Sequence, residues 1–129
     1  MKIIGRQWYW TYEISDFNQK VVESFFKKTR FLNQGEFRLL EVDNFVKLPI
    51  HFPIRCLVFS RDVIHSWTVP SLIVKIDANP NQINRVYLKS LMNGLHYGQC
   101  SEICGINHRF MPIKLEFTSP LLFNLWLLN

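Results

Sequence analysis

Alanine is nearly missing from this 129-residue sequence, where it occurs once, at Ala78. Because alanine is the best helix former, a helical bundle of this length would normally use many alanines. Valine, isoleucine, phenylalanine, tyrosine and tryptophan are abundant instead, and these residues favour strands. The composition therefore argues against a helical bundle and predicts a strand-rich protein.

Long apolar runs are also lacking. No segment reaches the ~18 to 20 consecutive apolar residues that a membrane-spanning helix needs. The N-terminal stretch Met1 to Gly5 is too short for a signal peptide and has no cleavage region. The apolar fraction of 48% is nevertheless that of a packed globular protein. We therefore expect residues 1–129 to form one domain with its own hydrophobic core.

Basic clusters are scarce, although the formal net charge is +5, from 15 lysines and arginines against 10 acidic residues. Lys27, Lys28 and Arg30 form the one basic cluster, which we interpret as a solvated loop. A nucleic-acid interface normally shows a basic stripe or a known binding motif, and the sequence has neither. Nucleic acid is therefore not an expected partner.

Short strand patterns fill most of the sequence. Residues 7–14 alternate, with Trp8, Trp10, Tyr12 and Ile14 on one face, which is typical of a half-buried strand. Further strands are predicted over residues 37–43, 54–60, 64–69, 71–76, 86–91, 95–99 and 111–117, with a long loop over 15–35. Asn93-Gly94 predicts a hairpin, and Pro120 predicts the first turn of a short helix over 121–128. Together these patterns predict an all-β sandwich or barrel with a short C-terminal helix.

The three cysteines are an odd number, so a framework of disulfides would leave one unpaired. Cys56 lies in an apolar run and is interpreted as a buried structural thiol. Cys100, Cys104, His108 and Met111 instead share twelve residues with the spacing C-x-E-x-C-x3-H-x2-M. Thiolates and thioethers select copper(I), and imidazole suits copper in either oxidation state. Because two cysteines on one loop can bridge two metal ions, the motif predicts a dinuclear copper site.

Two bridged coppers need a second terminal imidazole, and the loop supplies only His108. Among His51, His65 and His96, we expect His65 to be the distant ligand, and the other two to be surface or hydrogen-bonded histidines. Met111 and the backbone carbonyl of Glu102 would complete the coordination as weak ligands. Two alternatives stay open: a disulfide between the loop cysteines, and a structural zinc site made by the two cysteines and two histidines.

Three segments of the sequence resemble cytochrome c oxidase subunit II, over about residues 3 to 118. They are Gly5-Arg6-Gln7-Trp8-Tyr9-Trp10, Asp62-Val63-Ile64-His65-Ser66-Trp67 with Val69-Pro70-Ser71, and Tyr97-Gly98-Gln99-Cys100-Ser101-Glu102-Ile103-Cys104-Gly105. The resemblance implies a cupredoxin-like Greek-key β-barrel that carries the dinuclear CuA centre. It also implies the copper ligands, namely His65, Cys100, Glu102 through its carbonyl oxygen, Cys104, His108 and Met111.

The same resemblance implies partners and further roles. Trp8 matches the surface tryptophan that receives electrons from cytochrome c, whereas its pattern alone predicts a core aromatic. The Glu102 carboxylate matches a ligand of a magnesium ion at the boundary with subunit I, which holds the haem that accepts the electrons. Glu13, Asp43 and Asp62 match acidic positions that face cytochrome c, although by themselves they are ordinary solvated charges. The implied setting is the proton-translocating oxidase of the mitochondrial inner membrane, with this domain in the intermembrane space, in preference to a bacterial periplasm.

This sequence departs from the family pattern in two ways, and each departure leads to a prediction. The family's subunit begins with two transmembrane helices, whereas this sequence has Met1 shortly before Trp8. We expect a split subunit whose transmembrane half is a separate polypeptide, with a truncated chain as the alternative. Residues 121–128 would then bury against that half or against subunit I, and other oxidase subunits are further implied partners. The second departure is the basic net charge, which predicts weak electrostatic steering of a lysine-rich cytochrome c.

Other functions compete with this interpretation. A copper chaperone of the oxidase-assembly kind also combines C-x3-C with a distant histidine, but on a thioredoxin-like fold. The copper domain of a nitrous oxide reductase-like enzyme shares the ligand spacing, although a tryptophan replaces Glu102 there. A mononuclear blue-copper protein needs only one loop cysteine, and a copper-free interaction subunit would need a degenerate site.

Overall fold

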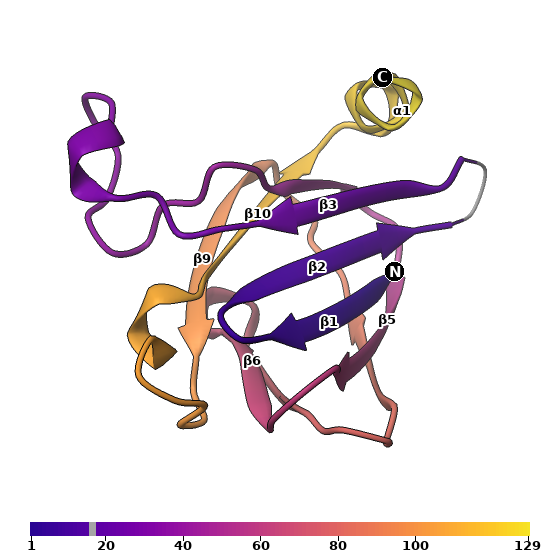
Figure 1. Ribbon diagram of the computed structural model, residues 1–129. Helices are drawn as coiled ribbons and strands as arrows, with labels where there is room; N and C mark the ends of the chain where they lie inside the picture. The colour runs from indigo at the N-terminus through magenta and orange to yellow at the C-terminus, as the bar shows by residue number, and fades with distance from the viewer. Residues whose placement is uncertain (16–17) are drawn as a thin grey trace.

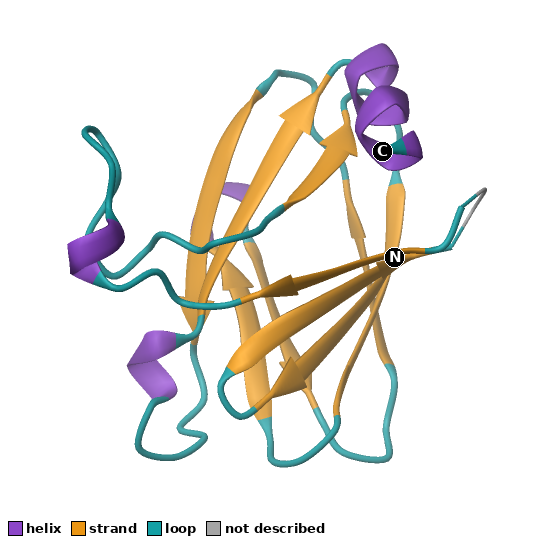
Figure 2. Ribbon diagram, turned by 45° about the horizontal axis from the view of Figure 1, so that its top comes forward, coloured by secondary structure: helices purple, strands orange, loops and turns teal. Residues whose placement is uncertain are grey.

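The computed structural model describes residues 1–15 and 18–129. In this part of the chain the strands form two five-stranded sheets, with strand orders β3-β2-β1-β5-β8 and β4-β10-β9-β6-β7 (Figure 1, Figure 2). The strands are β1 (Lys2–Arg6), β2 (Tyr9–Ile14), β3 (Lys20–Ser24), β4 (Val46–Pro49), β5 (Ile54–Ser60), β6 (His65–Val69), β7 (Val74–Ala78), β8 (Asn84–Leu88), β9 (Gly94–Cys100) and β10 (Pro112–Thr118). Helical turns are η1 (Thr29–Phe31), η2 (Pro70–Leu72) and η3 (His108–Phe110), and one α-helix, α1, spans Pro120–Leu128.

The core lies between the two sheets. Trp10, Tyr12 and Trp67 are fully buried there, and the Trp67 indole N–H donates to the Tyr12 hydroxyl at 3.2 Å. This hydrogen bond pairs two polar groups that burial would otherwise leave unsatisfied. Burial also raises the pKa of Tyr12, so its hydroxyl stays protonated. The prediction of an all-β sandwich is therefore confirmed.

The C-terminal helix is also confirmed. Ser119 caps α1 by accepting a hydrogen bond from the Leu122 N–H at 3.3 Å, and Pro120 occupies the first turn, where its missing N–H costs nothing. Within the described residues, no helix combines the length and the apolarity that crossing a bilayer requires.

The predicted loop over 15–35 is wrong in part, because it contains β3. Val22 and Ser24 are buried on one face of this strand while Val21 and Glu23 are exposed. The adjacent valines conceal this alternation, since one of them faces solvent. The first residues of the predicted loop include Asp16 and Phe17, which lie outside the described residues.

The predicted strand over 37–43 is wrong. Leu39 has a φ of +69°, which no strand accommodates, and Val42 makes only an isolated bridge with Phe26. Two neighbouring side chains of this segment are buried, the charged Glu41 at 1% exposure and the apolar Val42 at 4%. The segment is therefore ordered by a buried charge and not by sheet pairing.

The predicted hairpin at Asn93-Gly94 is also wrong. The strand before it, β8, pairs with β5 in one sheet, whereas β9 pairs with β6 and β10 in the other. The connection therefore crosses between sheets instead of folding back on itself. The strand predicted over 54–60 is confirmed, and the one predicted over 71–76 begins later, after η2, as β7.

Candidate metal centre

Sheet pairing brings the distant histidine to the cysteine loop. His65 begins β6, Cys100 ends β9, and these strands pair antiparallel with Trp67 opposite Cys100. The Ser101 N–H donates to the Ser66 carbonyl at 3.0 Å, which extends this contact by one residue. The register of two neighbouring strands therefore places His65 beside Cys100, although 35 residues separate them.

The side chains predicted as metal ligands converge on the two thiols. The Nδ1 atom of His65 lies 4.0 Å from the Cys100 Sγ, and the Glu102 carbonyl oxygen lies 3.3 Å from the same sulfur. The Cys104 Sγ lies 3.6 Å from the Nδ1 of His108 and 3.5 Å from the Sδ of Met111.

The ligand atoms of His65, Cys100 and Cys104 all lie within 4.8 Å of one another, and all three residues are buried. Met111 is also buried, whereas His108 is partly exposed. The centre is therefore enclosed on the side of the sheet and accessible on the side of His108.

His65 is oriented by Asp62. The imidazole Nε2 lies 2.9 Å from the Asp62 Oδ1, so the other ring nitrogen, Nδ1, faces the thiols. Such a carboxylate partner fixes the ring orientation of a ligating histidine. Burial opposes the His65 imidazolium, but contacts with Cys100 and Asp62 outweigh burial and raise its pKa above the ordinary value. Burial likewise opposes ionisation of Asp62, but donors from His65, Gln7 and Val63 lower its pKa overall.

The two loop thiols have different acidities. Burial opposes the Cys100 thiolate, but hydrogen bonds from His65 and from the backbone at Ser66 and Glu102 bring its pKa below the ordinary value. Burial and repulsion by Cys100 raise the pKa of Cys104 to about 12. All cysteines of the described residues are free thiols, so the alternative of a disulfide between the loop cysteines is not what the structure shows.

Trp8 lies in the turn between β1 and β2 and not on the buried face of a strand. Its side chain is partly exposed, and its indole N–H donates to the Cys104 carbonyl at 3.1 Å. The pattern-based prediction of a core aromatic is therefore wrong, because the alternating strand starts only at Tyr9. Gly105 permits the contact, since a Cβ on it would lie 3.0 Å from the indole ring.

The carboxylates of the remaining predicted residues are not part of the thiol group. Glu13 is near the far end of β2, where its carboxylate is 4.0 Å from the Lys2 Nζ. Asp43 accepts a hydrogen bond from the Phe25 N–H at 2.9 Å. Glu102 is exposed, so its carboxylate faces outward from the buried sulfurs. None of these carboxylates belongs to the His65–Cys100–Cys104 group.

The other histidines and the third cysteine match their predictions. His51 is exposed, and the Nδ1 of His96 lies 2.7 Å from the Ser71 hydroxyl. Cys56 is fully buried in the core, and burial raises its pKa to about 12. Sequence reasoning missed Gln7, whose side chain contacts the cysteine loop; its place beside Trp8 was the one available signal.

A family model and a solved structure that match this chain indicate the same family. The model of the family described as cytochrome c oxidase subunit II, periplasmic domain, matches residues 1–118. The crystal structure of the periplasmic domain of subunit II (CoxB) of Bradyrhizobium japonicum is 39% identical, with a TM-score of 0.89, and the match covers 98% of this chain and 88% of that one. The cupredoxin-like architecture that the resemblance implied is thereby confirmed.

Two further solved structures are similar. One is a mixed disulfide between the thioredoxin-like protein TlpA and subunit II of cytochrome c oxidase; its similarity is 38% identity over 98% of this chain and 85% of that one, at a TM-score of 0.81. The other is a heme-copper terminal oxidase dimer, at 18% identity over 91% of this chain and 63% of that one, with a TM-score of 0.60. The last similarity concerns the fold alone.

Proposed function

Because this chain belongs to the cytochrome c oxidase subunit II family, we propose that it is the module through which electrons enter a cytochrome c oxidase. It would accept electrons from cytochrome c at a dinuclear copper centre and pass them to haem in subunit I. The observation that carries the proposal is the buried group of His65, Cys100 and Cys104, whose ligand atoms lie within 4.8 Å of one another.

The donor set fits copper. Two thiols, two imidazole nitrogens, a thioether and a carbonyl oxygen surround one small volume, and soft sulfur donors with imidazole are the ligands that copper prefers. When bound there, copper would supply a one-electron redox couple. A structural zinc site would use only the thiols and imidazoles. The buried Met111, with its Sδ against the Cys104 Sγ, therefore favours copper.

The protein's own contribution is to fix the donors and to link them to the surface. Asp62 holds the His65 ring with Nδ1 toward the thiols. Trp8 connects solvent with the loop, since its partly exposed indole donates directly to the Cys104 carbonyl. A donor protein seated over Trp8 would thus be one hydrogen bond from the backbone of a ligand residue.

The exposed positions of the domain suggest where its proposed partners would bind. Cytochrome c would dock over Trp8, and subunit I would lie near the exposed Glu102, whose carboxylate is free to ligate a shared magnesium ion. The exposed leucines of α1, among them Leu121 and Leu128, would bury against other oxidase subunits. We further propose that the domain works in the mitochondrial intermembrane space; the family model describes a periplasmic domain, which lies on the corresponding side of a bacterial inner membrane.

A thioredoxin-like protein is a further proposed partner, because a subunit II relative was captured in a mixed disulfide with one. Cys100 and Cys104 are both free thiols close to one surface loop. Such a partner would keep this pair reduced, as copper ligation requires thiolates. A copper chaperone function loses support, because the chaperone alternative needs βαβ units and the described strands form two sheets joined without them.

Electron paramagnetic resonance (EPR) of the copper-loaded protein tests the proposal. We expect two coppers per chain and a hyperfine pattern from two equivalent nuclei sharing one unpaired electron. His65→Asn should abolish this pattern, and His51→Asn, which changes an exposed histidine, should leave it intact. A four-line signal from one copper in the unmodified protein, or no copper uptake, would overturn the proposal.

A further inference from the structure

We propose that Gln7 is a positioning residue of the centre, which ties the Trp8 indole and the His65 side of the site to the backbone of the cysteine loop. Its redox role rests on the proposed function, whereas its hydrogen bonds do not. Gln7 lies in the turn between β1 and β2, far in sequence from both ligand segments. Gln7 is an exposed residue, and exposure alone would indicate an ordinary solvated glutamine.

Two neighbouring side chains donate to one carbonyl. The Gln7 Nε2 lies 2.8 Å from the Cys104 carbonyl oxygen, and the Trp8 Nε1 lies 3.1 Å from the same atom. A carbonyl oxygen has two lone pairs, so this pair of donors satisfies it completely. Gln7 therefore helps to hold the Cys104 peptide in the orientation that the indole needs.

The backbone of Gln7 supports the other half of the site. Its N–H donates to the Asp62 Oδ2 at 2.7 Å, and the Oδ1 of the same carboxylate lies 2.9 Å from the His65 Nε2. One residue thus touches the group that orients His65 and the peptide that carries Cys104. The two ligand segments are connected through the β1–β2 turn as well as through sheet pairing.

This arrangement has two consequences. Donors aimed at the peptide of a ligand residue stabilise added negative charge nearby, so they raise the reduction potential of the centre. They also fix the distance from the indole to the Cys104 backbone, along which an electron would travel. Without the Gln7 amide, the Cys104 carbonyl keeps only the indole donor, and the turn loses its side-chain contact with the loop.

Gln7→Leu removes the side-chain donor at similar size and keeps the backbone N–H that serves Asp62. We expect the copper centre to stay dinuclear by EPR, because no ligand changes. Its oxidised-to-reduced ratio at fixed ambient potential should rise about threefold to tenfold, a fall in reduction potential of up to about 59 mV for one electron. Gln7→Glu, which places an acceptor and a negative charge against the carbonyl, should lower the potential further. Gln34→Leu, at an exposed glutamine of another loop, is the matched control.

The carbonyl itself gives a readout that needs no copper. In protein labelled with 13C at the cysteine carbonyl, Gln7→Leu should shift one infrared C=O band to higher wavenumber, as a lost hydrogen bond does. Trp8→Phe, which removes the second donor, should shift the same band, and the double variant should shift it further. An unchanged band and an unchanged potential in Gln7→Leu would overturn the inference while leaving the dinuclear EPR pattern, and thus the proposed function, standing.

Discussion

Two long irregular segments lie on the same side of the sandwich and are ordered in different ways. The copper loop comprises residues 101–111, and the excursion comprises residues 25–45, which projects beside it (Figure 1, Figure 2). They meet where the Phe26 and Phe110 rings lie 5.1 Å apart. These two rings also line an open aromatic cavity of about 560 Å³, together with Trp8 and Phe25.

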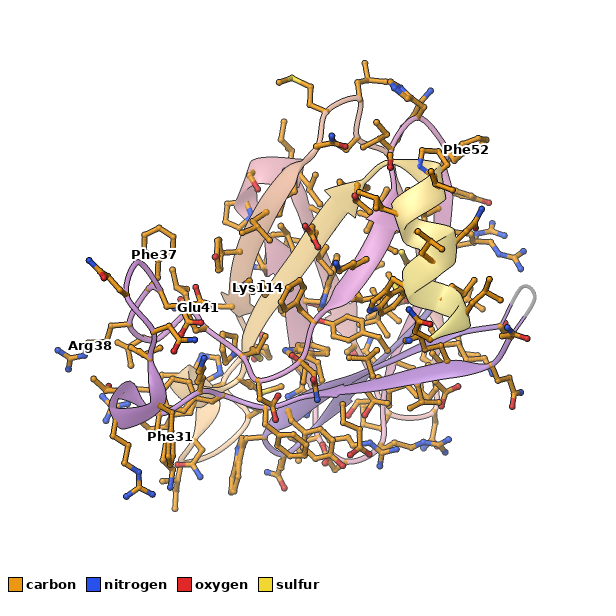
Figure 3. The ribbon with its side chains drawn as sticks, turned by 90° about the horizontal axis from the view of Figure 1, so that it is seen from above. Phe31, Phe37, Arg38, Glu41, Phe52 and Lys114 are labelled. Carbon is orange, nitrogen blue, oxygen red and sulfur yellow. The ribbon has the colours of Figure 1, made fainter. Side chains whose placement is uncertain are left out.

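The excursion is anchored by a buried ion pair. The Lys114 Nζ, from β10, lies 2.7 Å from a Glu41 carboxylate oxygen, and the two side chains point toward each other in Figure 3. The Tyr97 hydroxyl donates to the same carboxylate at 3.0 Å. Beyond this anchor the tip is solvated, and Phe31 and Phe37 are more than half exposed.

Among the described residues, the copper loop has no such ion pair. Its polar contacts are made by its own backbone carbonyls or join proposed ligand atoms to one another. Gln7 and Trp8 hold the Cys104 carbonyl, and the Trp10 indole donates to the Met111 carbonyl at 3.2 Å. The excursion is thus fixed to β10 by one buried ion pair, whereas the loop is shaped around a centre that metal would complete. The two segments should therefore respond to different changes.

Breaking the buried pair should destabilise the protein more than any other change considered below. Glu41→Gln keeps the size of the side chain but leaves the Lys114 charge buried without a partner. Removal of one member of a buried ion pair costs about 3–5 kcal/mol in the free energy of unfolding. Chemical unfolding of the variant and the unmodified protein, in the same metal state, measures this cost. The EPR signal of the copper-loaded variant should stay dinuclear, because Glu41 touches no ligand.

Two further variants are controls for Glu41→Gln. Glu36→Gln weakens the pair with Lys27 near the tip, a 2.9 Å contact between side chains that keep 21% and 22% exposure, and should lower the unfolding midpoint far less than Glu41→Gln because solvent screens this pair. Glu41→Gln combined with Lys114→Met removes both charges and should recover most of the lost stability. If Glu41→Gln alone proved as harmless as Glu36→Gln, the excursion would not depend on its buried charge.

The same contrast explains which parts could be predicted from sequence. The copper loop could be recognised from the sequence because Cys100, Cys104, His108 and Met111, four of the proposed ligand residues, have a fixed local spacing and are the residue types that copper prefers. The position of His65 could not be predicted from local spacing, because pairing of β6 with β9 brings it to Cys100. The excursion was mispredicted because its order comes from Glu41 and Lys114, 73 residues apart, and no local pattern encodes such a pair.

Two other wrong predictions, the hairpin at Asn93-Gly94 and the core position of Trp8, have a similar cause. Asn93-Gly94 is a strong local hairpin signal, but the strands around it join opposite sheets, and only the global fold decides that. Trp8 continues the alternation of β2 in the sequence, yet the chain turns there, so its partly exposed side chain packs at the margin of the core and its indole donates to the Cys104 carbonyl. Period and spacing thus predicted most of the elements and selected the proposed ligands, whereas contacts between segments required the structure.

An intermediate effect is expected from a pair of glycines, one in each segment. Gly105 of the copper loop has a φ of +124°, and Gly35 of the excursion has a φ of +86°. Alanine at either position should cost about 1–2 kcal/mol through backbone strain. A Cβ at Gly105 would also lie 3.0 Å from the Trp8 ring, whereas nothing lies within 4 Å of one at Gly35.

Gly105→Ala should therefore displace the indole and slow electron uptake from cytochrome c about tenfold, an effect typical of lost support around a metal site. Gly35→Ala should lose stability alone. Stopped-flow reduction of the copper-loaded variants, together with their unfolding midpoints, separates the two outcomes. Equal reduction rates in both variants would show that the contact between Gly105 and Trp8 has no part in electron transfer.

The smallest expected effect concerns salt. Lys28 lies at the edge of the aromatic cavity that Trp8 also lines, and its positive charge offsets the carboxylates of Asp43, hydrogen-bonded to Phe25, and Asp62, hydrogen-bonded to Gln7. The association rate with a basic cytochrome c should therefore fall by no more than about threefold between low and physiological ionic strength, where strongly steered pairs lose tenfold or more. Lys28→Glu with Arg30→Glu supplies free carboxylates on the excursion and should make the fall steeper. Stopped-flow mixing across a salt series measures both slopes, and a steep fall in the unmodified protein would show that its local field is acidic despite the net charge.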